Sequence, residues 1–209
     1  MDAQGPRETT KRITFIGGPG SGKSTTAADL FVQLKKLGRN VEMIQEWIRR
    51  DIMRNGPMQT VFEQYRTLLY HRREEEHFPP NVEYLIHDGN TLTPYFYAAI
   101  YADKSDARER LVVQDMHAAL LDDLYSRKYD LIYFLPRAFA DASGAHFHDG
   151  TRFQTATEVA VLEDYMNLLF TKVHRMDNVR VLDCPLAVRN EVLIGDILGP
   201  TEVARWKQL

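Results

Sequence analysis

The chain alternates between short apolar runs and longer segments in which apolar residues recur every three or four positions. The short runs are rich in β-branched and aromatic residues and lie at 11–16, 41–44, 83–89, 130–136 and 178–183. Runs of this length and composition predict five strands. Because helical patterns separate them, the sequence predicts an α/β fold with a parallel sheet and helices on both faces.

The helical segments have a period near 3.6 residues and end at recognisable signals. Residues 23–37 place Ala27, Leu30 and Leu34 on one face, and Gly38 follows as a terminating glycine. We also expect helices at 57–77, 93–101, 108–126, after the Thr155–Glu158 capping box, and at 190–198. The side chains expected to point inward are Val61, Phe62, Tyr65, Leu68 and Leu69 in the second helix, and Leu111, Val112, Ala118, Ala119 and Leu124 in the fourth.

The same pattern sets the domain organisation. The 209 residues suit one domain, which we place at 11–200, between a disordered tail at 1–10 and a C-terminal tail at 201–209. The stretch 137–154 has no periodicity and is long for a connection inside a compact domain. Such loops are often functional, so we expect a lid there.

Composition and charge narrow the class of protein. The formal net charge of −3 argues against a protein that coats nucleic acid by bulk electrostatics. The single cysteine, Cys184, cannot form an internal disulfide, which fits a reducing compartment. The chain shows no signal peptide and no apolar run long enough for a bilayer. We therefore expect a cytoplasmic protein without a membrane partner.

The segment "FIGGPGSGKSTT" carries the most specific chemistry. Gly17 and Gly22-Lys23-Ser24 have the P-loop spacing, between a predicted strand and a predicted helix. Glycines let successive backbone N–H groups converge on phosphate oxygens, the helix adds its positive end, Lys23 bridges the β- and γ-phosphates, and the Ser24 hydroxyl binds Mg²⁺. The nucleotide-binding residues that we predict are Gly17, Gly18, Pro19, Gly20, Ser21, Gly22, Lys23, Ser24 and Thr25.

Two acidic residues follow predicted strands, where ligands bind in this class of sheet. Asp88 ends the third strand and could hold Mg²⁺ or accept a proton from a substrate hydroxyl, or simply form a turn with Gly89. Glu46 follows the second strand and could act as general base, or lie on a solvated helix start. The pattern leaves open which of the two is the base.

Further candidates are basic or aromatic. Arg49 and Arg50 could bind an acceptor with their guanidinium groups, or be ordinary surface charges. Arg152, in the predicted lid, could stabilise the negative charge of a transferring phosphate. Tyr95 belongs to an aromatic cluster with Phe96, Tyr97 and Tyr101 that could line a substrate pocket or pack in the core.

With these residues assembled, the chain resembles the P-loop small-molecule kinases, in particular the AAA-like family related to the nicotinamide riboside kinase domain and common in phage genomes. The matching segments are "ITFIGGPGSGKST", "EWIRR", "YLIHDGNTLTPYFYAAIYA" and "GTRFQTATEVAVLEDYMNLL". The resemblance implies a five-stranded sheet of order 2-3-1-4-5, with the Asp88 strand beside the P-loop strand. This chain departs from the family pattern at "HDGNT", where Gly89 stands in place of a bulkier residue.

The resemblance also implies a function. We expect ATP and Mg²⁺ as cofactors and transfer of the γ-phosphate to a hydroxyl of a small nucleoside- or nucleotide-like acceptor, in the host cytoplasm if a phage encodes the chain. Arg152 matches an arginine that many members carry before the last strand. Two alternatives stay open. One is an acceptor-independent ATPase or switch. The other, less favoured, is a kinase of nucleic acid ends or bases that uses Arg49, Arg50, Arg54, Arg72 and Arg73 as a basic groove.

Overall fold

The structure, a computed structural model, describes residues 10–58, 60–78, 82–136, 154–173 and 176–208. Five parallel strands form one sheet in the order β2-β3-β1-β4-β5. Their bounds are β1 Lys11–Gly17, β2 Val41–Ile44, β3 Tyr84–His87, β4 Leu131–Leu135 and β5 Val179–Val181. The predicted strands and the order implied by the family resemblance are therefore confirmed.

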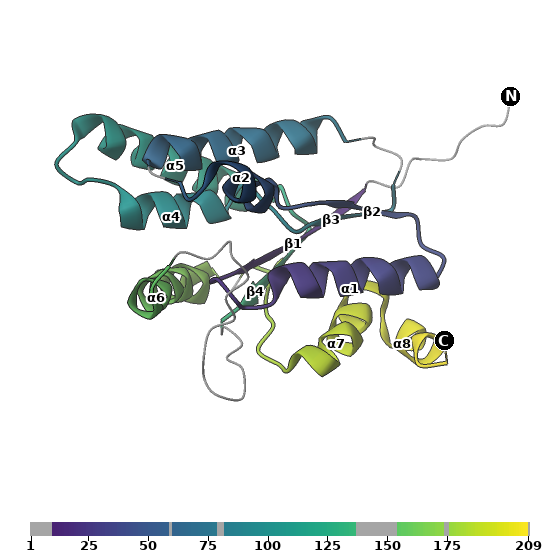
Figure 1. The fold of residues 1–209 in the computed structure, drawn as a ribbon. Helices are drawn as coiled ribbons and strands as arrows, with labels where there is room; N and C mark the ends of the chain where they lie inside the picture. The colour runs from purple at the N-terminus through teal and green to yellow at the C-terminus, as the bar shows by residue number, and fades with distance from the viewer. Residues whose placement is uncertain (1–9, 59, 79–81, 137–153, 174–175, 209) are drawn as a thin grey trace, which may run out of the picture.

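Helices follow every strand, as Figure 1 shows. Their bounds are α1 Lys23–Lys36, α2 Trp47–Asn55, α3 Val61–Glu76, α4 Thr93–Tyr101, α5 Ala107–Tyr125, α6 Ala156–Val173, α7 Leu186–Leu198 and α8 Pro200–Trp206. Two differences from the sequence expectation stand out. α2 was not predicted as a helix of its own, and α8 occupies most of the stretch expected to be a C-terminal tail. Pro200 at the first turn of α8 and the positive φ of Gly199 let the chain turn directly from one helix into the next.

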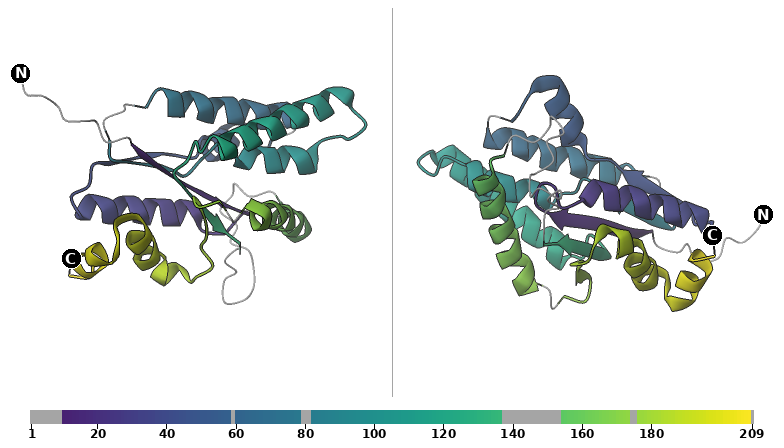
Figure 2. Two further views of the ribbon diagram at one scale, coloured as in Figure 1. Left: turned by 180° about the vertical axis from the view of Figure 1, so that it is seen from behind. Right: turned by 60° about the horizontal axis from the view of Figure 1, so that its bottom comes forward.

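The sheet divides the core into two clusters. Alternate residues of β4 face opposite sides, so Ile132 and Phe134 join the cluster under α3, α4, α5 and α6, while Tyr133 joins the cluster under α1 and α7. Figures 1 and 2 show α3, α4 and α5 stacked on one side of the sheet and α1, α7 and α8 on the other. Because all five strands are parallel, their carboxyl ends lie along one edge of the sheet, and the P-loop follows β1 at that edge.

Several expected inward side chains prove to be exposed. Phe62 and Leu69 of α3 are 46% and 48% exposed, and Leu111 of α5 is 61% exposed; Ala118 is exposed too. For α3 the expectation is confirmed for Val61 and Leu68 and wrong for Phe62 and Leu69, because polar residues share the buried face. The buried positions of α3 are Val61, Gln64, Thr67, Leu68, His71 and Glu75.

Two expectations fall on residues outside the described ranges. These are the disordered tail, of which only Thr10 is described, and the lid at 137–154, of which only Gln154 is described. Among the described helices, none combines the length and hydropathy needed to cross a lipid bilayer.

Candidate active site

The P-loop connects β1 to α1 as the sequence predicted. Gly20 and Gly22 have φ angles of 81° and 83°, a left-handed conformation that disfavours any residue with a Cβ atom. The Ser21 N–H donates to the Gly18 carbonyl at 3.2 Å, and α1 begins directly after Gly22. The turn therefore delivers the N-terminus of a 14-residue helix to the edge of the sheet, where it can bind an anion.

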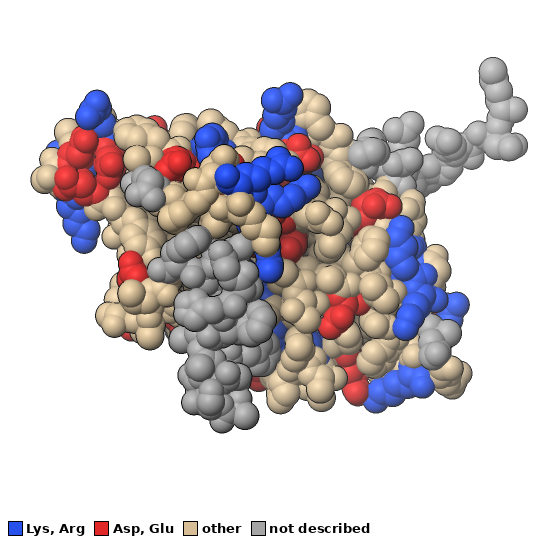
Figure 3. All heavy atoms as spheres, viewed as in Figure 1, with Lys and Arg blue, Asp and Glu red and all other residues tan. Residues whose placement is uncertain are grey.

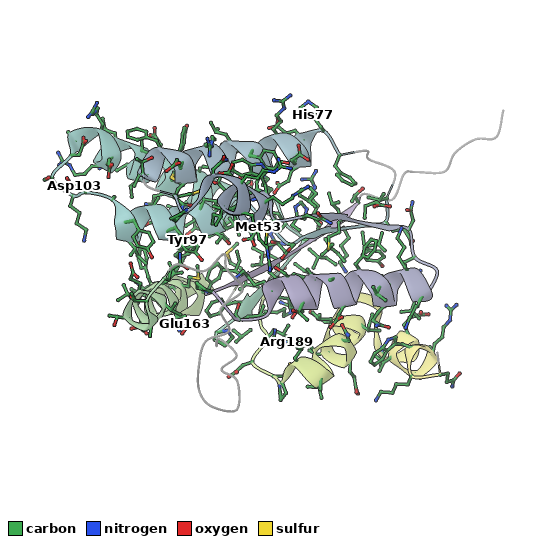
Figure 4. All side chains as sticks on the ribbon, viewed as in Figure 1. Met53, His77, Tyr97, Asp103, Glu163 and Arg189 are labelled. Atoms are coloured by element: carbon green, nitrogen blue, oxygen red, sulfur yellow. The ribbon has the colours of Figure 1, made fainter. Side chains whose placement is uncertain are left out.

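Lys23 and a buried arginine hold the loop from two directions. The Lys23 Nζ donates to the carbonyls of Gly17 and Gly18 at 2.8 and 3.0 Å. Arg189 of α7 is 4% exposed and donates from Nη1 to the Ser21 carbonyl at 3.0 Å and to the Thr26 Oγ1 at 2.9 Å. Figure 4 shows Arg189 beside the start of α1. Sequence reasoning missed this residue, since an arginine on an amphipathic helix carries no signal of burial.

Asp88 lies next to the P-loop, as expected for a residue at the end of the strand paired with β1. Its N–H donates to the Ile44 carbonyl at 3.0 Å, which ties the end of β3 to β2. Burial raises the pKa of the Asp88 carboxyl, while hydrogen bonds from the Ser24 hydroxyl and the Glu46 backbone and the nearby charges of Lys23 and Arg49 oppose that rise. The structure thus brings together Lys23, Ser24 and Asp88, three of the predicted site residues.

The donor set beside Asp88 suits a hard cation. The Asp88 Oδ1 is buried and has no hydrogen-bond partner among the described residues, and the Ser24 hydroxyl lies against the same carboxylate. Within the described parts of the chain, no group of three or more His, Cys, Asp or Glu side chains is placed to hold a metal. This set fits Mg²⁺, which typically takes one or two protein oxygen ligands and completes its shell with water and substrate phosphates.

A cavity of about 490 Å³ opens beside this loop. Its volume suits a small-molecule ligand. One end is formed by the P-loop, including Lys23, Ser24 and Thr25. The other end is formed by α2, α3 and α4 and by the residues that follow β3, so a single cavity spans the phosphate cradle and a separate binding region.

The α2 segment contributes one predicted acid and one predicted arginine. Glu46 immediately precedes α2, and both Glu46 and Arg49 line the cavity. Arg50 is exposed and does not line it. In Figure 3, Lys and Arg atoms gather over α2, which also carries Arg54. Trp47, the first residue of α2, stacks on Tyr70 with 4.8 Å between ring centroids.

The aromatic cluster of α4 divides between core and cavity. Tyr95 is 7% exposed, does not line the cavity, and its hydroxyl hydrogen-bonds that of Tyr165 at 2.5 Å. The substrate-binding position expected for Tyr95 is therefore corrected, because the helix turns this ring toward α6. Tyr97 and Tyr101 line the cavity in its place. Tyr97 comes two residues after Tyr95 and therefore points to another side of α4, and Tyr101 lies one helical turn beyond Tyr97.

Asn90 is a further residue that the sequence did not single out. Its Nδ2 donates to the Phe15 carbonyl at 3.0 Å, and its Oδ1 accepts the N–H of Thr93 at 2.8 Å. It thus joins β1, the end of β3 and the first turn of α4, and it also lines the cavity. An Asn shortly before a Thr-Pro helix start was the available signal.

The start of α6 forms the remaining wall. Thr155 and Glu158 form the predicted capping box, since the Thr155 N–H donates to Glu158 at 2.7 Å and the Glu158 N–H to the Thr155 Oγ1 at 3.3 Å. Glu158 and Gln154 line the cavity and hydrogen-bond the Tyr101 hydroxyl. Arg152, expected to act from the adjacent lid, lies outside the described residues.

A buried polar cluster lies behind the cavity, on the α3 side of the sheet. We define it as Glu75, His87, Asp123, Lys128 and Tyr129. Glu75 accepts a hydrogen bond from the Tyr129 hydroxyl at 2.6 Å, and the Lys128 Nζ lies 3.0 Å from its other oxygen. Burial alone would raise the pKa of Glu75, but His87, Lys128 and Tyr129 outweigh it and lower the pKa to about 2.

Comparison with known proteins agrees with this architecture. The family described as "AAA domain" matches residues 12–180, most of the chain. Comparison with curated proteins gives no match.

Among solved structures, a deoxyadenosine kinase from M. mycoides with dCMP and dCDP bound has a TM-score of 0.60 at 15% identity, over 89% of this chain and 98% of that one. The same kinase with bound dATP gives 0.61 at 19%, over 90% and 98%. A NadR protein in complex with NAD and AMP-PNP gives 0.65 at 15%, over 97% of this chain and 51% of NadR. At these identities the likeness shows the fold, which is that of the P-loop kinases. The chain therefore belongs to the AAA domain family that matches it and has a nucleoside kinase-like P-loop fold.

Proposed function

We propose that this protein is an ATP-dependent kinase that transfers the γ-phosphate to a hydroxyl of a nucleoside-like acceptor. The observation that carries the proposal is the single cavity that joins the P-loop to a second region formed by α2, α3 and α4, with Asp88 and Glu46 in its wall. A nucleotide-binding loop that only switches conformation has no need of an enclosed acceptor region. The fold neighbours include a deoxyadenosine kinase and NadR, which supports a nucleoside-like acceptor.

On the nucleotide side, the P-loop backbone and the α1 N-terminus would hold the phosphates of ATP. The Lys23 ammonium, which now contacts the carbonyls of Gly17 and Gly18, would turn toward the β- and γ-phosphates. Mg²⁺, held by Ser24 with Asp88, would neutralise charge on the phosphate oxygens when bound. Arg189 keeps the loop in register by fixing the Ser21 carbonyl.

On the acceptor side, a carboxylate has to orient the hydroxyl and take its proton. Glu46 and Asp88 both line the cavity next to the P-loop. Burial raises the pKa of Asp88, which strengthens it as a proton acceptor compared with an exposed aspartate. Glu46 is the alternative base, and Asp88 would then serve mainly the metal.

Phosphate transfer tests the proposal directly. The protein is incubated with Mg²⁺, γ-labelled ATP and a panel of nucleosides, nucleoside monophosphates, nicotinamide riboside and oligonucleotides. We expect label on a nucleoside-like compound, with the rate lost in Asp88→Asn or Glu46→Gln. Asp51→Asn is the matched control, because Asp51 lies on α2 but pairs with Arg66 outside the cavity. Steady phosphate release with no labelled acceptor would contradict the proposal and favour an ATPase.

One observation favours a second candidate, a kinase of nucleic acid ends. The arginines of α2 form a basic surface beside the cavity mouth, although the chain is acidic as a whole. The basic groove that the sequence suggested loses one of its five arginines, because the Arg72 Nη2 lies 3.4 Å from the Oδ1 of Asp123 in the buried polar cluster. Labelling of an oligonucleotide with a steep loss of rate at higher salt would support this candidate.

A further inference from the structure

His71 is a buried side chain of the cavity wall to which nucleotide binding assigns no role. It lies on α3, is 2% exposed and lines the cavity. Burial lowers its pKa to about 4, with Glu75 opposing the shift, so the imidazole is neutral near pH 7. A neutral imidazole offers one N–H donor and one nitrogen acceptor.

Gly89 leaves the space that the His71 ring occupies just after the end of β3. A Cβ atom built at Gly89 would lie 2.2 Å from the His71 Cε1 and 2.9 Å from the Glu46 Cα. A side chain at position 89 would therefore occupy the space that the His71 ring fills. This explains the departure from the family pattern at "HDGNT". The His71 ring and the Glu46 backbone thus both pack against Gly89, the residue after Asp88.

The surroundings of His71 indicate a ligand with neutral polar groups. Its Nδ1 is buried and has no hydrogen-bond partner among the described residues. An unpaired buried nitrogen is unfavourable until a ligand or another partner supplies a hydrogen bond. Gln64 and Thr67 precede it on the same face of α3; both are buried, at 9% and 2% exposure, and both line the cavity. This face of α3 thus offers Gln64, Thr67 and His71 to the cavity as hydrogen-bonding groups, whereas the arginine that lines the cavity, Arg49, comes from α2.

We propose that His71 is a specificity-determining residue of the acceptor site, which hydrogen-bonds a second hydroxyl of the acceptor beside the one that receives the phosphate. The inference rests on the proposed kinase function. A hydroxyl both donates and accepts a hydrogen bond, so it matches a neutral imidazole, whereas a phosphate group would need a positive charge. The acceptor is accordingly a compound with neighbouring hydroxyls, such as a ribonucleoside, rather than a simple alcohol.

The test compares a ribonucleoside with its 2′-deoxy and 3′-deoxy counterparts as acceptors. In the wild type we expect kcat/KM to fall about 10-fold for one of the two deoxy compounds, the size of one lost hydrogen bond. His71→Phe and His71→Ala should lower kcat/KM for the ribonucleoside by a similar factor and abolish the difference between it and the deoxy compound. His71→Asn, which keeps a donor and an acceptor, should recover part of that difference. The KM for ATP should not change.

His77→Phe is the matched control, because His77 is exposed at the end of the same helix. This variant should discriminate between the ribonucleoside and the deoxy compounds as the wild type does. Figure 4 shows His77 at the end of α3. The proposal is overturned if the wild type does not discriminate, or if His71→Phe or His71→Ala, whichever folds by circular dichroism, keeps the wild-type ratio. Failure of the wild type to phosphorylate any nucleoside would instead overturn the kinase function itself, and this inference with it.

Discussion

The two faces of the sheet are built differently. The cluster under α1 and α7 is largely apolar; Arg189 donates to the Ser21 carbonyl and to the buried Thr26 hydroxyl, and the Tyr133 hydroxyl donates to Asp196. The cluster under α3, α4 and α5 is also apolar toward α6, but beside β3 it contains His71 and the buried polar cluster around Glu75. One face is a plain platform for the phosphate loop, and the other buries ionisable groups behind the acceptor region.

This difference indicates a division of labour. Phosphate binding needs a loop held in a fixed conformation and an ammonium group that can turn toward the phosphates. A rigid apolar layer beneath the loop supplies the fixed conformation. Acceptor recognition needs polar side chains aimed inward, and these can be buried only when hydrogen bonds and opposite charges compensate them. Changes on the α1 face should therefore affect turnover and ATP, whereas changes on the α3 face should affect stability, its pH dependence and the acceptor.

The largest expected effect is on the α1 face. Lys23→Ala removes the charge that we propose turns toward the transferring phosphate, so we expect kcat to fall by about 10³-fold, comparable to the loss of a principal charge-stabilising donor. The midpoint of thermal unfolding should stay near that of the wild type. Lys36→Ala, exposed at the other end of α1, is the control. Comparable turnover in both variants would show that the loop does not act as proposed.

The next effect tests the α3 face. Glu75→Ala leaves Lys128 and the Tyr129 hydroxyl without their buried partner, so the free energy of unfolding should fall by about 3–5 kcal/mol in denaturant titrations. Glu76→Ala, exposed at the end of α3, should change it by less than about 0.5 kcal/mol. Equal effects of the two substitutions would refute the contrast drawn between the faces.

The pH dependence of stability provides a third test. The pKa of His71 is lowered from 6.5 to about 4, so the unfolded chain binds the proton first as pH falls. Stability should thus decline by about 3 kcal/mol between pH 6.5 and pH 4, in excess of other groups. The lowered pKa of Glu75, about 2, adds a further loss from about pH 4.5 downward. His71→Phe should lack the first decline and His77→Phe should keep it; identical profiles would argue against a buried neutral His71.

The smallest effect concerns Arg189. Arg189→Leu removes two hydrogen bonds to the P-loop and α1, so the KM for ATP should rise about 10-fold while the acceptor KM stays constant. Arg205→Leu, on the surface of α8, should leave both constants unchanged. A rise in the KM for the acceptor together with the KM for ATP would contradict the proposal that Arg189 affects only the nucleotide end of the cavity.

The sequence predicted the fold well because strand runs and glycine signals are local. The bounds of β2 and α4 agree with prediction at both ends, and the P-loop followed from its spacing and its place between a predicted strand and a predicted helix. Position after a strand predicted that Asp88 and Glu46 would lie at this edge of the sheet, and both line the cavity there; their roles stay predictions. Gln64, Thr67 and His71 were missed, because their helical spacing in the sequence was masked by the neighbouring apolar residues Phe62 and Leu69, which prove to be exposed. Only the packing of α3 against the sheet decides which of the two faces is buried.

The central claim is that one cavity brings ATP and a nucleoside-like acceptor together. The most direct measurement is the stoichiometry of products by mass spectrometry, after incubation with Mg²⁺, ATP and nucleosides. The account predicts one molecule of ADP for each molecule of phosphorylated nucleoside and little free phosphate. ADP formed together with free phosphate, with every nucleoside recovered unchanged, would contradict it.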